Sequence, residues 1–177
     1  MYLLDTPVIA ELRKARAGKA DSHVTTWASG IASQNMFMSA LSLLELESGV
    51  ALAERKDKAQ GIILRTWLDE QVMKAFDGRI LAVDAAVVKK RAALYAGDPR
   101  GGEGQRGRDA LLAATALVHG LTLVTRNLAA FRGGRVKLFN PWGYTPEAGD
   151  GVSDSDADWQ QATQSGPLWL KNLFLRF

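Results

Sequence analysis

The sequence predicts an α/β sandwich in which helices cover both faces of a central, mainly parallel sheet of about five strands. Short apolar runs that resemble strands alternate along the chain with longer segments of helical periodicity. The connections between these segments are short, and 177 residues are enough for one domain with its own core. Apolar residues make up 47% of the chain and charged residues 23%, a balance typical of folded proteins rather than disordered ones.

The chain begins with a strand followed by a helix. Residues 2–4 are apolar and end at Asp5, after which Thr6 can cap a helix and Pro7 can occupy its first turn. The later strands that we expect span residues 36–38, 79–83, 121–125 and 136–138. The later helices that we expect span residues 20–33, 39–53, a long segment from there to Phe76, 85–95 and 109–119.

Helix-end signals support this assignment in the second half of the chain. Asp84 is placed to cap the helix of residues 85–95, and Gly120 to close the alanine-rich helix that we expect Asp109 to open. The glycine-rich segment 101–107 predicts a flexible loop. The carboxyl ends of the strands lie at one edge of such a sheet, so the polar residues that follow strands are the candidate site residues.

Charge and cysteine content narrow the classes of function. The chain has no cysteine, which excludes disulfides, thiolate metal sites and thiol nucleophiles. The formal net charge is +3, and residues 145–177 carry five acidic and two basic side chains, so the basic excess lies in residues 1–144. A basic body suits a polyanionic partner such as a nucleic acid.

The order of charges at the N-terminus does not match a secretion signal. Asp5 lies within the first apolar stretch and the basic residues follow it, and no apolar run approaches the roughly 20 residues needed to span a bilayer. We therefore expect a cytoplasmic protein with no membrane association.

A change of composition divides the chain after Tyr144. Residues 145–177 begin with a stretch rich in Pro, Gly, Ser and acidic residues, which is typical of a linker. Residues 167–177 are strongly apolar again and need a surface to cover them. We expect one domain over residues 1–144, followed by an acidic linker and an apolar C-terminal extension.

Four oxygen-bearing side chains map to one edge of the predicted sheet. Asp5 follows the first strand, Glu45 lies in the helix after the second strand, Asp109 opens the helix before the fourth strand, and Asn127 follows the fourth strand. Carboxylates that converge in one cleft repel each other unless a cation neutralises them. Oxygen ligands of this kind suit Mg²⁺ or Mn²⁺.

Periodicity alone leaves one choice open. Glu45 and Glu47 are two residues apart on a helix, so only one of them can face the cleft. The two histidines, His23 and His119, are too few and too poorly placed for a ribonuclease that uses paired histidines. A phosphoacceptor receiver domain needs paired acids after the first strand and a lysine after the fifth, and neither is present.

Four segments in this order resemble the successive motifs of PIN-domain ribonucleases, close to the VapC-like and FitB-like toxins of bacterial toxin–antitoxin pairs. The segments are Leu3–Thr6, Ser39–Gly49, Asp109–Ala116 and Leu123–Phe131. The resemblance covers about residues 1–144 and implies a PIN-like α/β/α sandwich. It also implies an endoribonuclease that depends on a divalent metal and hydrolyses RNA phosphodiester bonds as the toxin of such a pair.

The resemblance assigns roles to the acidic residues. Asp5, Glu45 and Asp109 take the places of the family's metal-binding catalytic acids, which selects Glu45 over Glu47, and the implied cofactor is Mg²⁺ or Mn²⁺. Thr6 and Thr125 are expected to orient these carboxylates by hydrogen bonds.

The sequence departs from the family pattern at three positions. Asn127, a fourth candidate catalytic residue, stands where many members carry a fourth acid, and an amide can ligate or position but cannot act as a base. Ala130 stands where an Asp often precedes the Phe, and Pro7 stands where an Asn or Ser is common. These departures support an alternative, a PIN-fold module that binds nucleic acid or a partner with weak or no cleavage.

The expected partners are RNA and other protein chains. Arg13, Arg108 and Arg126 are candidate contacts to RNA phosphates. The resemblance further implies a cognate antitoxin protein, a homodimer and a toxin–antitoxin hetero-oligomer.

Overall fold

A computed structural model of the protein describes residues 1–94, 96, 104–131 and 135–146, and within these residues five strands form one sheet. Every pairing between neighbouring strands of this sheet is parallel. The parallel α/β architecture expected from the sequence is therefore confirmed. The strands are β1 (Tyr2–Leu4), β2 (Met36–Ser39), β3 (Ile80–Leu81), β4 (Thr122–Val124) and β5 (Leu138–Phe139).

The strand order, β3-β2-β1-β4-β5, places β1 at the centre of the sheet. Tyr2 lies opposite Met36 of β2 on one side and Thr122 of β4 on the other. The chain builds the sheet outward from β1 through β2 to β3, and then crosses back to add β4 and β5 on the opposite side. The carboxyl ends of β1 and β4 therefore form the topological switch point, where α/β proteins bind their ligands.

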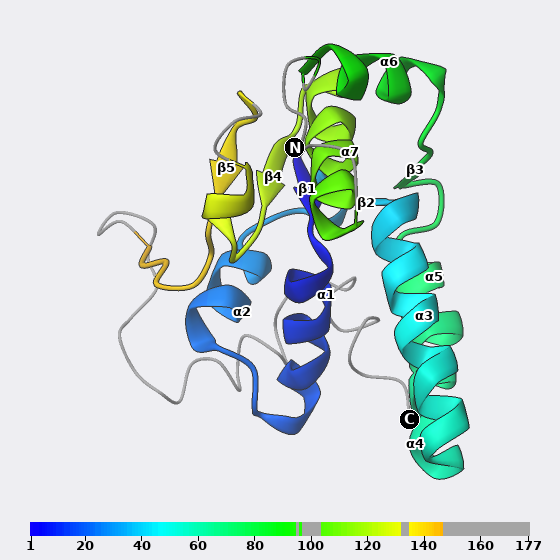
Figure 1. The fold of residues 1–177 in the computed structure, drawn as a ribbon. Coiled ribbons are helices and arrows are strands. Elements are labelled where there is room, and N and C mark those ends of the chain that lie inside the picture. Colours follow the sequence, from blue (N-terminus) through cyan, green and yellow to red (C-terminus); the bar gives the residue numbers. More distant parts are fainter. Residues whose placement is uncertain (95, 97–103, 132–134, 147–177) are drawn as a thin grey trace.

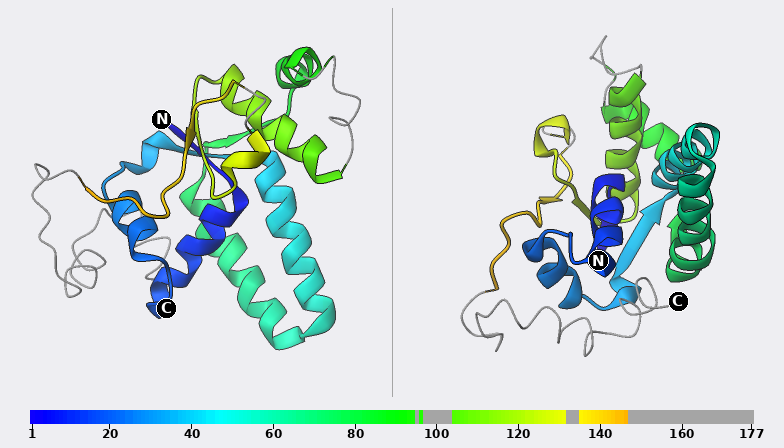
Figure 2. Two further views of the ribbon diagram at one scale, coloured as in Figure 1. Left: turned by 60° about the vertical axis from the view of Figure 1, so that its left-hand side comes forward. Right: turned by 90° about the horizontal axis from the view of Figure 1, so that it is seen from below.

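Helices cover both faces of this sheet (Figures 1 and 2). In chain order the helices are α1 (Thr6–Arg13), α2 (Ser22–Ser29), α3 (Ala40–Lys56), α4 (Lys58–Trp67), α5 (Met73–Ala75), α6 (Ala85–Leu94) and α7 (Gly104–Val118). The remaining turns are 3-10 helices η1 (Lys14–Ala17), η2 (Ser33–Asn35) and η4 (Leu128–Phe131), and a π-helical segment η3 (Leu68–Val72). No described helix combines the length and the apolar composition that crossing a membrane requires.

Alternating side chains of the strands supply two cores. In β1, Leu4 packs in a core with buried residues of α1, α2, α3 and the α4–α5 region, whereas Leu3 packs in a second core with α7 and η4. Both leucines are fully buried. Successive side chains of a strand point to opposite faces of the sheet, so a strand with both faces covered buries its side chains alternately in the two cores. The short apolar runs of the sequence therefore become the middle layer of a three-layer sandwich.

Two expected helix starts differ in the structure. Asp5, not Thr6, caps α1, because its Oδ1 accepts the backbone N–H of Thr6, while Pro7 does occupy the first turn as expected. The helix expected over 20–33 is shorter, because Asp21 caps α2 and the helix ends before Gly30. In both cases an aspartate one residue before the first helical turn provides the cap.

Two expected helix boundaries differ in position. The first of two successive helices, expected to end at residue 53, continues to Lys56, and Asp57 caps α4; the long helix expected to follow to Phe76 is α4, η3 and α5 in succession. Helices α3 and α4 pack against each other as an antiparallel pair (Figure 1). Asp109 does not open its helix, because α7 already begins at Gly104, inside the segment expected to be a loop. Residues 101–103 of that segment, and the expected linker and extension from residue 147, lie outside the described residues.

A glycine permits the close crossing of α3 and α4. A Cβ at Gly61 would lie 2.5 Å from the Cα and 2.8 Å from the backbone N of Glu54. We expect Gly61→Ala to lower the free energy of unfolding by ~1–3 kcal/mol because backbone atoms must move apart. A Cβ at Gly49, in α3, would have nothing within 4 Å, so Gly49→Ala should stabilise by ~0.5–1 kcal/mol. Urea unfolding of both variants is the test, and equal effects would contradict this crossing.

Candidate active site

Asp5 stands at the switch point, directly after the central strand. Its backbone N–H donates to the carbonyl of Val124 in β4 at 3.0 Å, which ties it to both β1 and β4. Oδ1 accepts the backbone N–H of Thr6 at 2.8 Å, and Oδ2 accepts the hydroxyl of Thr125 at 2.7 Å. The carboxylate is thus held in one orientation by two donors from different segments.

Glu45 reaches the same place from α3. Its Oε2 accepts the hydroxyl of Thr6 at 2.5 Å, so one threonine contacts both carboxylates, through its N–H to Asp5 and its hydroxyl to Glu45. Its Oε1 lies 3.6 Å from the guanidinium of Arg108, and 22% of the Glu45 side chain is exposed. Ser42, one turn earlier in α3, donates its hydroxyl to the carbonyl of Leu4 at 3.4 Å, which fixes the helix against β1.

Glu47 faces away from this cluster. Its Oε2 accepts from Arg65 of α4 at 2.7 Å, and Arg65 also pairs with Glu54. The structure therefore places Glu45, not Glu47, beside Asp5. This difference in direction is the one expected for two residues separated by two positions on a helix.

Burial raises the pKa of Asp5 above its usual range, and the negative charges of Glu45 and Asp109 raise it further. The hydrogen bonds from Thr125 and Thr6 lower the pKa and offset part of this effect. Asp109 therefore lies close enough to act electrostatically on Asp5, from the second turn of α7. The two neighbouring acids destabilise the ionised form of the partly buried Asp5, and a bound cation would offset this repulsion.

Asn127 enters the site through its backbone. Its N–H donates to the hydroxyl oxygen of Thr125 at 3.1 Å, and that hydroxyl in turn donates to Asp5. Thr125 is fully buried, whereas Asn127 is exposed. The backbone of Asn127 thus supports the donor that holds Asp5, while its side chain lies at the surface of the site.

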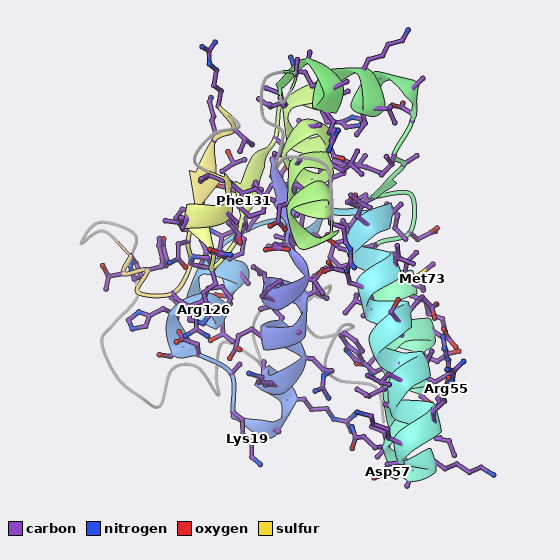
Figure 3. The ribbon with its side chains drawn as sticks, in the orientation of Figure 1. Lys19, Arg55, Asp57, Met73, Arg126 and Phe131 are labelled. Atoms are coloured by element: carbon purple, nitrogen blue, oxygen red, sulfur yellow. The ribbon has the colours of Figure 1, made fainter. Side chains whose placement is uncertain are left out.

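The three candidate RNA-binding arginines lie at different distances from the carboxylates. Arg108 contacts Glu45 directly. Arg126, labelled in Figure 3, follows β4 and lies over the ring of Trp142 at 5.4 Å. Arg13 lies at the far end of α1, over the ring of Trp67 at 5.6 Å, and so is not brought together with the acids.

The donor atoms of this site fit a divalent cation. They are carboxylate oxygens, which suit a hard cation, and they include the partly buried Asp5, whose pKa is raised by burial and by its acidic neighbours. Among the described residues no three His, Cys, Asp or Glu side chains are already arranged as a complete metal-binding group. Magnesium commonly takes only one or two carboxylates and completes its shell with waters, and Asp5 and Glu45, joined through Thr6, offer carboxylates of this kind.

Sequence patterns did not indicate Trp142 or Ser42. Trp142 holds Arg126 from a turn after β5, and Ser42 anchors α3 to β1. Both contacts join segments that are far apart in the sequence, so no local pattern could have indicated them. His23 contacts the carbonyl of Tyr144 through Nδ1 at 2.6 Å and has no described part in the acidic site.

Comparison with known proteins places these residues in a family. The sequence matches the PIN domain over residues 2–133. The chain is 32% identical over 142 residues to the toxin FitB of Neisseria gonorrhoeae, covering 80% of this chain and 99% of that protein. It is 31% identical over 142 residues to the VapC ribonuclease Y4jK of Sinorhizobium fredii, covering 80% of this chain and 98% of that protein.

The fold agrees with this match. The crystal structure of FitAcB from Neisseria gonorrhoeae superposes with a TM-score of 0.71 at 31% identity, over 81% of this chain and all of that one. PIN-domain ribonucleases in general depend on a divalent metal, in agreement with the carboxylate site. The sequence match spans well over half of the chain and includes Asp5 and Thr125 with the strands that precede them. The chain therefore belongs to the PIN-domain family.

Proposed function

We propose that this protein is a divalent-metal-dependent endoribonuclease and the toxin component of a toxin–antitoxin pair. The observation that carries the proposal is that Thr6 holds the carboxylates of Asp5 and Glu45 together at the switch point of the sheet, where the negative charge of Asp109 also acts on Asp5. The names of its relatives, a toxin and a VapC ribonuclease, support the same activity.

The three acids would hold Mg²⁺ or Mn²⁺, directly or through water. When bound, such an ion supplies a lowered pKa for a coordinated water and positive charge near the phosphoryl oxygens. The chain's own part is to keep the carboxylates in place. Thr6 holds one oxygen of Asp5 through its N–H and one of Glu45 through its hydroxyl, and Thr125 holds the other oxygen of Asp5. Such supporting hydrogen bonds typically contribute ~10–100-fold to metal affinity or activity.

Substrate contacts come from residues around the acids. Asn127, exposed at the end of β4, can position a phosphate or a water but cannot take its proton. Arg108, half-exposed beside Glu45, and Arg126, held over Trp142, can each meet an RNA phosphate. Arg13 is too far along α1 to contact the same phosphate, since eight residues of helix rise ~12 Å.

The proposed partners follow from the relatives. FitAB has been solved bound to a DNA fragment, IR36, with a TM-score of 0.70 and 29% identity to this chain. We infer that this protein likewise pairs with a cognate antitoxin, forms a homodimer within that hetero-oligomer, and acts on RNA in the cytoplasm.

Cleavage of RNA is the test of this function. The purified protein is incubated with end-labelled RNA, and we expect fragments that EDTA abolishes and that added Mg²⁺ or Mn²⁺ restores. Asp5→Asn should be inactive, because it removes a charge from the centre of the acidic site while retaining the capping oxygen. Cleavage that persists in EDTA at the same rate would refute metal dependence.

A second function is favoured by Asn127 and Ala130, which leave the end of β4 without a fourth acid. A PIN-fold binding module would bind the same RNA without cutting it. In Mg²⁺ such a module would shift the RNA in a native gel. The cleavage assay would show no fragments from either the wild type or Asp5→Asn.

A further inference from the structure

A groove lies on the side of the sheet covered by α1, away from the acidic site. One wall is the end of α1 with η1, and the other is α4 with η3. Lys19, just after η1, and Asp57, at the start of α4, mark the far ends of these walls in Figure 3. The groove has a volume of about 560 Å³. We call it the α1–α4 groove, and it is lined by Arg13, Arg16, Ala17, Ile62, Ile63, Thr66, Trp67 and Gln71.

The groove exposes apolar surface. Ile62 and Ile63 are 58% and 59% exposed, which makes them two of the most exposed large apolar side chains of the described residues. They are adjacent on α4, and no described residue covers their exposed surface. Contiguous apolar surface of this kind marks a site of interaction.

The groove also holds a polar group without a partner. Trp67 is only 8% exposed, and its buried indole N–H has no acceptor among the described residues. A buried donor that stays unpaired costs ~1–3 kcal/mol. Because this N–H is itself buried, an occupant of the groove can accept it only after the Trp67 ring turns toward the groove, and a carbonyl or carboxylate oxygen would then remove that cost.

The charge of the groove is positive. Arg13 lies over the Trp67 ring at 5.6 Å, and Arg16 lines the same cavity. The groove therefore suits a peptide with apolar side chains, main-chain carbonyls and acidic residues nearby.

The same chain contains such a segment after its last described residue, Pro146. From 147 to 170 there are five acidic residues and no lysine or arginine. Residues 168–177, with the sequence LWLKNLFLRF, are then mostly large and apolar. Their charged side chains are Lys171 and Arg176, so any acidic complement to Arg13 and Arg16 comes from residues 147–158. The curated relatives are covered almost to their full length by about 80% of this chain, so this segment is additional to what they share.

The described chain ends beside α2, with α1 between this end and α4 (Figure 1), so the reach of the residues that follow decides whether they can arrive at the groove. Tyr144 packs on the core that contains α1, α2 and Trp67, and its carbonyl contacts His23 of α2. The segment from 147 to 167 can span at most ~70 Å when extended. A domain of this size has a radius of gyration of only ~15 Å, so the segment can reach the groove.

We propose that residues 168–177 dock in the α1–α4 groove of their own chain. The apolar side chains of the segment cover Ile62 and Ile63, a main-chain carbonyl accepts the Trp67 N–H, and the acidic residues before it lie near Arg13 and Arg16. Docking of this segment does not depend on nuclease activity, and its test has no activity readout.

Disulfide trapping in the full-length chain is the experiment, because the protein has no cysteine and every thiol is therefore one that is introduced. Ile63→Cys is combined in turn with Trp169→Cys, Leu170→Cys, Leu173→Cys and Phe174→Cys. The control pairs use Leu52→Cys, which is 52% exposed on α3 and does not line the groove. Mild oxidation is followed by non-reducing electrophoresis and mass spectrometry.

A tethered segment that does not dock would react with both groove and control positions at similar rates, since both are within reach. We expect at least one Ile63 pair to form an intrachain disulfide about tenfold or more faster than its Leu52 partner, at a rate independent of protein concentration. Equal rates for all four pairs would overturn the proposal. Disulfides between two chains that disappear on dilution would also overturn it, and would assign the groove to a second copy.

Hydrogen exchange gives a second readout that does not depend on thiol geometry. Backbone amides of residues 168–177 should be protected in the wild type, and Ile63→Asp should remove this protection while Leu52→Asp does not. Protection that survives Ile63→Asp, or that is absent from the wild type, would contradict docking in this groove.

Discussion

Glu45→Gln is expected to reduce RNA cleavage by about 100-fold or more, equivalent to at least ~2.7 kcal/mol of transition-state stabilisation. Glu45 contributes a carboxylate to the acidic site and is held there by the Thr6 hydroxyl at 2.5 Å. The amide retains the shape of the side chain but loses the negative charge needed to hold a divalent cation. The measurement is the initial rate of cleavage of a labelled RNA in Mg²⁺ or Mn²⁺.

Glu47→Gln is the matched control, since it makes the same chemical change two residues away on the same helix. Glu47 is paired with Arg65 on α4 and does not face Asp5. Both side chains of this ion pair are partly exposed, so its loss should cost little stability and leave the cleavage rate within about twofold. If Glu47→Gln were the inactive variant, the assignment of the α3 acid would be wrong.

Asp5→Asn should make the metal-free protein more stable at neutral pH, despite abolishing activity. Burial and the charges of Glu45 and Asp109 raise the pKa of Asp5 in the folded state. The folded protein therefore binds the Asp5 proton more tightly than the unfolded chain does, and the ionised carboxylate costs stability. This cost is absent below the ordinary aspartate pKa of 3.8, grows as the pH rises through the raised folded pKa, and is constant above it.

The measurement is the melting temperature of wild type and Asp5→Asn between pH 3 and 8 in EDTA. The advantage of the variant should appear only as the pH rises above about 4, and each kcal/mol corresponds to ~2–4 °C for a chain of this length. Asp84→Asn is the control, because Asp84 caps α6 through the N–H of Val87 but lies outside the acidic site. An advantage of the same size and pH dependence for Asp84→Asn would show that the effect is not specific to the site.

The strands were predictable because their signal is local. Each is a short apolar run in a sheet whose two faces are covered by helices, and the structure places all five within the expected segments or one residue beyond them. The order of the strands, with β1 between β2 and β4, follows from long-range pairing and was not expected from any single segment.

Helix ends were predicted less well, because capping depends on one side chain. A second helix was expected directly after residue 53, but it starts at Lys58, because Asp57 accepts the N–H groups of Ala59 and Gln60. Gly104 lies in a run of glycines that favours a loop on its own, yet α7 begins there. Helix propensity is a weak signal that packing of the rest of the helix can override.

The site was predictable in composition but not in geometry. Asp5 and Glu45 were identified from their positions beside the predicted strands, and the resemblance selected Glu45 over Glu47; the structure brings Asp5 and Glu45 together through Thr6. The contact between Arg108 and Glu45 and the support of Arg126 by Trp142 could not be predicted, since both depend on how α7 and the end of the domain pack.

Calorimetric titration with Mn²⁺ tests most directly whether the three acids form a metal site. We expect the wild-type protein to bind Mn²⁺ with measurable heat and an Asp5→Ala, Asp109→Ala double variant, folded by circular dichroism, not to bind it. Both residues belong to the acidic site, so their loss removes two of its three carboxylates. Equal binding of Mn²⁺ by the wild type and the double variant would contradict a metal site built from these acids.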